Sequence, residues 1–119
     1  MSFKCLIVGT LVLILSSTGY VSDRVLQPLE NKYESFTRSN RPVDYIVILG
    51  CGHTSDSALP ATSQLQACSL QRLVEGLRIF RIHPEAQVIT SGAAFDNNES
   101  NADKVKQAAI LLGIPEHKI

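Results

Sequence analysis

The stretch Val43-Asp-Tyr-Ile-Val-Ile-Leu-Gly-Cys-Gly-His-Thr-Ser-Asp-Ser-Ala-Leu-Pro60 decides the fold. Residues 45–49 are apolar, rich in β-branched side chains and lack polar alternation, which is typical of a parallel strand buried on both faces. The small and polar residues after them predict a loop at the carboxyl end of this strand. In open α/β sheets ligands bind beyond such ends, where glycines let backbone amides approach them closely. We therefore expect the loop from Gly50 to Pro60 to present backbone amides to a ligand.

The residues after this loop predict three more elements of regular structure. They are a helix over 70–80 that ends by Pro84, a strand at 86–90, and a helix over 102–112 that is capped by Asn98 or Ser100 and stopped by Gly113 and Pro115. Strand, helix, strand and helix in this order are the unit of a parallel sheet. The predicted fold class is α/β, the first βαβα portion of a Rossmann-like sheet.

Both loops that come after the strands fall on the same edge of the predicted sheet. The sequence therefore predicts one shared pocket, whose residues are Gly50, Gly52, His53, Ser91, Gly92, Asp96 and Glu99. Two strands cannot bury both their faces and two helices, because parallel sheets of this class are larger and covered on both sides. We expect residues 43–119 to be the N-terminal part of a larger domain.

The segment from Phe3 to Val21 is apolar, with Lys4 as its one charge. As a helix it would be about 28 Å long, close to the hydrocarbon thickness of a bilayer. A membrane anchor, a cleaved signal peptide and a buried helix of a soluble domain all fit this composition. The first two place the rest of the chain across a membrane. Residues 22–42 are polar and contain prolines, which predicts a juxtamembrane linker.

Charge and motif content exclude several classes of partner. The formal net charge is zero, so no basic surface recommends nucleic acid. The run from Gly50 to Ser55 has serine at the third glycine of the dinucleotide fingerprint, and the second strand ends without an acid for a ribose. There is no Walker-type phosphate loop and no clustered Cys or His spacing, so the sequence predicts no metal site and leaves any cofactor unknown.

Three side chains are candidates for chemistry at the shared edge. His53 can bind an anion or shuttle a proton, or can be a solvated loop residue. Glu99 can act as a general base, although a carboxylate at a helix start also interacts favourably with the helix N-terminus. Arg72 is either a surface charge or a donor to a phosphate or carboxylate. We take His53 and Glu99 as candidate catalytic residues, and Gly50, Gly52, Arg72, Ser91 and Gly92 as candidate ligand-binding residues.

Cys51 and Cys68 are the one pair that could form a disulfide outside the apolar segment, which contains Cys5. The sequence does not give the Cα separation that a disulfide requires. We favour a role for Cys51 as a small residue in a tight loop.

The order and spacing of four segments resemble the ElyC/SanA/YdcF family of bacterial envelope proteins. The segments are Val43–Gly50, Ser69–Arg78, Val88–Gly92 and Leu112–Glu116. One member of the family also has a segment like Val21–Glu30 just after a membrane helix. The resemblance covers about residues 15 to 119. It implies a Rossmann-like domain that faces the periplasm from the inner membrane and works in peptidoglycan assembly or lipid-carrier metabolism.

Mapped onto this sequence, the family's site residues are Gly50, Gly52, Arg72, Ser91, Gly92 and Glu99. Family loops of this kind usually run Gly-Gly-Gly and Ser/Thr-Gly-Gly, whereas this chain has Cys51 at the middle of the first and Ala93 at the end of the second. The family also continues for another half domain. The implied partner is an anionic small molecule or a lipid-linked envelope precursor, and the resemblance leaves open whether the protein is an enzyme, a binding module or an inactive remnant.

Overall fold

The computed structural model describes residues 3–37, 41–94 and 99–119. The chain divides into two compact units, residues 1–37 and 38–119, which are described separately. Asp96 and Asn98, predicted as a pocket residue and a possible cap, lie outside the described residues.

The N-terminal unit contains two helices, α1 (Phe3–Ser16) and α2 (Gly19–Glu30). The prediction of one continuous helix over 3–21 is wrong, because the helix is interrupted at Ser17 and Thr18. The hydroxyls of Ser17 and Thr18 donate to the carbonyls of Ile14 and Leu15, and Thr18 has an extended backbone. Such side-chain bonds to the backbone compete with helix propagation.

Among the described residues, no single helix has both the length and the apolar composition to cross a membrane. The pair α1 and α2 passes that test together, with a bend of 62° between them.

The second unit has the predicted order of strands and helices, and the α/β class is confirmed. Its elements are β1 (Tyr45–Leu49), α3 (Ala61–Gln64), α4 (Ala67–Ile82), β2 (Gln87–Ser91), α5 (Asn101–Leu111) and a final 3-10 turn (Glu116–Lys118). The short helix α3 was not predicted. The two strands pair in parallel, with Tyr45 opposite Gln87 and Leu49 opposite Ser91.

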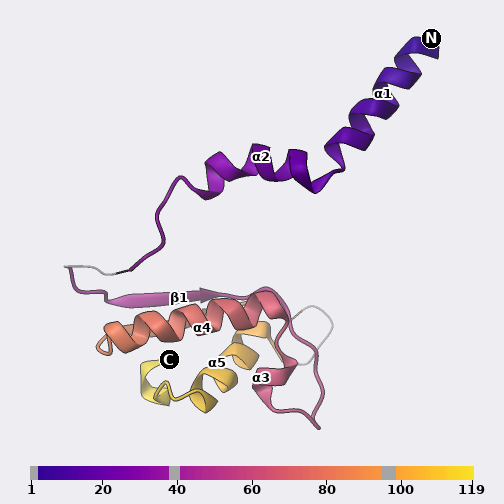
Figure 1. Cartoon of the computed structure of the whole chain (residues 1–119). Coiled ribbons are helices and arrows are strands. Elements are labelled where there is room, and N and C mark those ends of the chain that lie inside the picture. The colour runs from indigo at the N-terminus through magenta and orange to yellow at the C-terminus, as the bar shows by residue number, and fades with distance from the viewer. Residues whose placement is uncertain (1–2, 38–40, 95–98) are drawn as a thin grey trace. The chain divides into compact units, whose positions relative to one another are not determined.

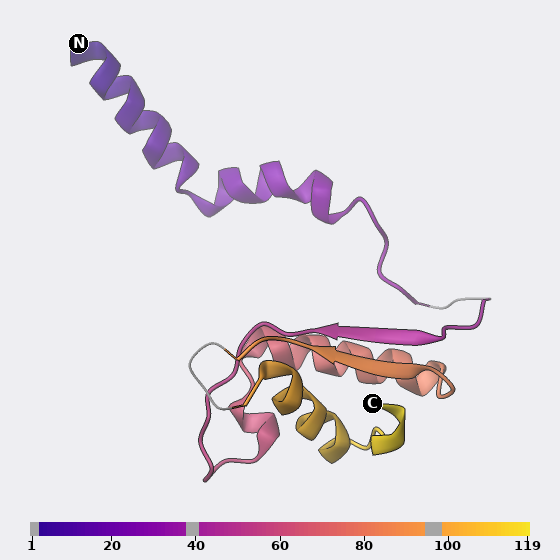
Figure 2. The same ribbon diagram turned by 180° about the vertical axis from the view of Figure 1, so that it is seen from behind.

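The core lies between the strands and the two long helices, and both helices cover the same face of the sheet (Figures 1 and 2). Ile46, Ile48 and Val88 point into it and are at most 6% exposed. From the helices come Leu73, Phe80, Val105, Ala108 and Ala109, joined by Ile114 from beyond α5. Burying a large aliphatic side chain contributes about 1.5–3 kcal/mol, so this layer holds the unit together.

Two glycines set the packing of the helices. A Cβ on Gly76 would lie 2.7 Å from Cδ1 of Ile48, so any other residue there would force the Ile48 side chain or α4 to shift. After α5, Gly113 has a φ of +99°, a backbone conformation that favours glycine, and the chain turns there as predicted.

Candidate functional site

The two strands end side by side, as the sequence predicted. Leu49 and Ser91 are register partners, so Gly50 and Gly92 come next at the same edge of the sheet. A Cβ on Gly50 would overlap the Ser91 carbonyl oxygen and the side chain of Asn101. Gly50, Ser91 and Gly92 are therefore brought together at this carboxyl edge.

The loop after β1 uses its backbone amides internally. The amides of Cys51 and Gly52 donate to Oγ of Ser69, at 3.1 and 3.0 Å, and the Ser69 hydroxyl donates to the Gly52 carbonyl at 2.9 Å. Ser69 is fully buried in the first turn of α4. The expectation that this loop presents these amides to a ligand is wrong, because one buried serine occupies both.

The rest of this loop is tied to Gln64 of α3. The Thr54 amide donates to the Gln64 carbonyl at 2.8 Å, and the Asp56 amide donates to the Gln64 side chain at 3.2 Å. The Gln64 side chain in turn donates to the Leu59 carbonyl at 2.6 Å. Gln64 is only 6% exposed, so the loop closes around a buried amide that satisfies its backbone.

Cys51 and Cys68 form a disulfide, with their Cα atoms 5.9 Å apart. The preferred interpretation of Cys51 as merely a small loop residue is therefore wrong. The start of α4 returns to the end of β1, which supplies the separation that the sequence could not give. Disulfides persist in oxidising compartments such as the periplasm.

His53 lies beside Asn101, the first residue of α5. Its Nδ1 is 3.4 Å from Nδ2 of Asn101, and its Nε2 is 3.4 Å from Oγ of Ser55. Asn101 was not predicted as a site residue. The signal was its position at a helix start after the second strand, at the edge where ligands bind in such sheets.

Glu99 pairs with the buried Lys104 at 2.5 Å and accepts a hydrogen bond from Gln107 at 3.0 Å. Hydrogen bonding to Lys104, then to Gln107, lowers the pKa of this carboxyl, and the charge of His53 acts in the same direction. A lower pKa makes the carboxylate a weaker proton acceptor. Within the described segments, no group of three or more His, Cys, Asp or Glu residues could hold a metal ion.

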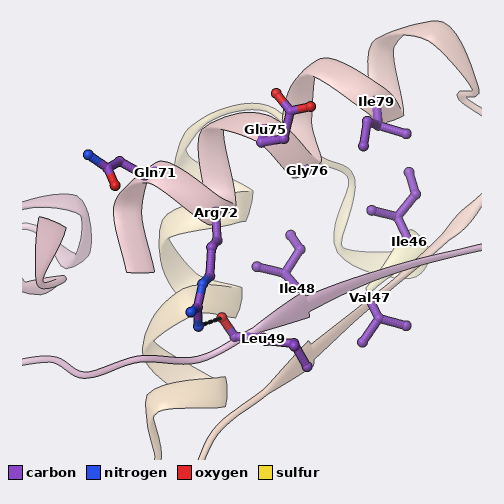
Figure 3. A pocket seen from close by; sticks show the side chains of 9 residues that line it. All are labelled: Ile46, Val47, Ile48, Leu49, Gln71, Arg72, Glu75, Gly76 and Ile79. Carbon is purple, nitrogen blue, oxygen red and sulfur yellow. Dashed lines mark hydrogen bonds between the residues drawn. The ribbon is translucent and has the colours of Figure 1, made fainter. Parts of the chain in front are cut away.

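Arg72 reaches from α4 to the end of β1 (Figure 3). Its Nη1 donates to the carbonyls of Gly50 and Leu49, at 2.9 and 3.2 Å. It lies in a groove of about 450 Å³ along the edge of β1. The groove is lined by Ile46, Val47, Ile48, Leu49, Gln71, Arg72, Glu75, Gly76 and Ile79. Gly50 thus contacts Arg72 through its carbonyl and Asn101 near its Cα.

Comparison with known proteins identifies two similar sequences, both of the same name. The envelope biogenesis factor ElyC of Escherichia coli strain K12 is 40% identical over 113 residues, and so is its counterpart in strain O157:H7. This chain resembles ElyC. The match covers 94% of this chain and 43% of each relative, so the chain spans less than half the length of the curated relatives it matches.

The predicted resemblance to this group of envelope proteins is confirmed for ElyC. No protein-family model matches the chain. No solved structure matches it either.

Proposed function

We propose that this protein takes part in biogenesis of the bacterial envelope as an ElyC-like protein of the inner membrane, with its α/β unit in the periplasm. The 40% identity to ElyC along 94% of the chain carries this proposal. The pair of strands would belong to a Rossmann-like sheet. The role would lie in peptidoglycan assembly or lipid-carrier metabolism.

Two features of the structure support the location. The side chains of α1 are exposed on all sides and almost entirely apolar, as expected for a helix surrounded by lipid. The second unit contains the Cys51–Cys68 disulfide, which fits an oxidising compartment. A reporter fused after Pro42 should therefore be active in the periplasm, and activity confined to the cytoplasm would contradict the topology.

The proposed ligand is a phosphate- or pyrophosphate-bearing envelope precursor, either free or lipid-linked, bound at the carboxyl edge. The amides of Cys51 and Gly52 are engaged by Ser69, so the proposed contacts to the anion come from side chains. Two carbonyls fix Nη1 of Arg72, and among the described residues nothing hydrogen-bonds its Nε or Nη2. Those nitrogens can donate to a phosphate, with His53 as a second donor when protonated.

Titration of the full chain in detergent with a polyisoprenyl pyrophosphate, and separately with inorganic pyrophosphate, tests this site. Arg72→Ala should weaken binding by about 1–3 kcal/mol, the scale of a hydrogen bond from a charged group. Arg81→Ala, on an exposed arginine near the end of α4, is the matched control and should leave affinity unchanged. Equal affinities in wild type and Arg72→Ala would place the ligand elsewhere.

A non-catalytic binding or interaction module is the second candidate. The ion pair of Glu99 with Lys104 favours it, since it lowers the pKa of the one carboxylate proposed as a general base. Phosphate release from the pyrophosphate probe distinguishes the two. Turnover that Glu99→Gln abolishes would establish an enzyme, whereas binding without turnover supports the module.

In a strain of Escherichia coli that lacks ElyC, expression of this chain should improve envelope integrity, measured as resistance to detergent. Arg72→Ala should lose that gain while the protein level stays constant. No improvement by the wild-type chain would contradict an ElyC-like role for these 119 residues acting alone.

A further inference from the structure

Asn101 is a buried polar side chain at the carboxyl edge. Asn101 is 4% exposed, and a Cβ placed on Gly92 would lie 2.8 Å from the Cβ of Asn101. A Cβ on Gly50 would overlap its Oδ1. Both glycines are therefore needed to admit this side chain, which places its amide between the ends of the two strands and against His53.

The two ends of this amide have unequal surroundings. Nδ2 is 3.4 Å from Nδ1 of His53, whereas Oδ1 is buried and has no hydrogen-bond partner among the described residues. Oδ1 also lies beside the Ser91 carbonyl oxygen, since both would overlap the same Cβ on Gly50. Both atoms are acceptors, and a buried acceptor without a donor is unfavourable.

A half-turn of the amide about its last torsion removes this conflict. The NH₂ group then takes the place of Oδ1 on the side of the Ser91 carbonyl, and Oδ1 takes the place of Nδ2 beside Nδ1 of His53. An oxygen at that position accepts a hydrogen bond if Nδ1 of the imidazole carries the proton. Both polar ends of Asn101 would then have partners without any movement of the backbone.

We propose that Asn101 is a positioning residue for His53, and that its Oδ1 accepts from Nδ1–H and holds the ring with Nε2 directed away from Asn101. This deepens the proposed function, because it rests on His53 as a ligand contact at this edge. The Nδ1–H bond is kept in the neutral ring and in the cation, so the ring keeps its orientation while Nε2 changes from acceptor to donor.

The surroundings of His53 fit this arrangement. Ser55 Oγ, 3.4 Å from Nε2, can rotate its hydroxyl either to donate to this nitrogen or to accept from it. The carboxylate of Glu99 interacts electrostatically with His53 and is itself bound to Lys104. When His53 is protonated, the pair of Asn101 and His53 therefore offers an oriented Nε2–H donor to an anion.

Nitrogen NMR of the histidine rings tests the proposal without any ligand. The full chain in detergent micelles is measured at about pH 8.5, where an ordinary imidazole is neutral. His53 should be mostly the Nδ1–H tautomer, with His117 as an exposed reference. A His53 ring that is mostly Nε2–H in the wild-type chain would overturn the proposal.

Two variants separate positioning from general structure. Asn101→Ala should shift His53 to mostly Nε2–H, whereas Asn101→Asp should retain Nδ1–H because a carboxylate oxygen also accepts from it. Asp is favourable in the first turn of a helix, but its second oxygen takes the place of the NH₂ group beside the Ser91 carbonyl, so circular dichroism checks the fold of each variant before its tautomer is measured. A folded Asn101→Ala with the wild-type tautomer, or loss of Nδ1–H in a folded Asn101→Asp, would contradict the role. Failure of pyrophosphate binding alone would contradict the proposed function and leave the tautomer result intact.

Discussion

The two faces of the sheet differ in how much of their apolar surface is buried, because both long helices pack on one face. On the covered face, Ile46, Ile48 and Val88 are packed under α4 and α5. On the bare face, Tyr45, Val47, Leu49 and Ile89 are 45–64% exposed. The run over 45–49 predicts burial on both faces, and the described residues bury one. The bare face therefore has the composition of a surface that another layer of polypeptide would cover.

The largest expected difference between the faces comes from the same substitution made on each side. Leu73→Ala removes a fully buried side chain from the covered face and should cost about 2–5 kcal/mol. Leu49→Ala, at 59% exposure on the bare face, should change stability by no more than about 0.5 kcal/mol. Hydrogen exchange of the β1 amides in the full chain measures both. Equal costs would show that the bare face is covered in solution.

The disulfide tests how firmly α4 is held over the covered face. Cys51 and Cys68 are 17 residues apart. In the chain-entropy model, a disulfide that closes a loop of that size stabilises the folded state by about 3 kcal/mol, because it restricts the unfolded chain. The double change Cys51→Ser and Cys68→Ser should therefore lower the stability of this unit by that amount. Cys5→Ser is the control, because this cysteine is free and lies in α1. Unaltered protection of β1 after full reduction of the wild-type protein would contradict the prediction.

Much of the second unit was predictable because it depends on local patterns. Short runs rich in apolar residues that lead into polar loops give both strands, and the 3.6-residue periodicity gives both long helices to within a few residues. The rule for parallel sheets then brings Gly50 to Ser91 and Gly92. Ser100 as the cap of α5 is also expected from its residue type.

The parts that were not predictable depend on contacts between distant residues. Ser69 appears in the sequence as a polar residue in a helix, and its occupation of the Cys51 and Gly52 amides requires the return of α4 to the loop. The same return creates the disulfide. Arg72 was predicted to donate to a ligand, and in the structure part of its guanidinium first fixes the end of β1.

A smaller effect is expected at the start of α5, which covers β2. Ser100 accepts from the Asp103 amide in a capping box, and Ser100→Ala should cost about 1 kcal/mol. Hydrogen bonds from the Ser100 side chain, and then from its backbone amide, hold the pKa of Asp103 below its ordinary value. A lowered pKa gives stability that is present above the unfolded value and is lost as the pH falls through the folded value. The difference in the free energy of unfolding between wild type and Ser100→Ala should narrow as the pH is lowered from neutral into strong acid. A difference that stays constant with pH would contradict this.

The smallest effect on stability, and the most informative about the bare face, should come from Val47→Thr combined with Ile89→Thr. These residues are register partners on adjacent strands, and threonine keeps the β-branched shape that strands favour. Stability should change by no more than about 0.5 kcal/mol because both side chains are largely exposed. We expect copies of the protein to associate through the exposed apolar face of the sheet, and the double variant should weaken this association because the pair lies at the centre of that face. Sedimentation velocity of the full chain in density-matched detergent measures this association at two protein concentrations.

Val74→Thr, at 54% exposure on α4, is the matched control and should sediment like the wild type. If Val74→Thr weakens association and the double variant does not, copies of the protein meet through α4, and the bare face stays open in solution.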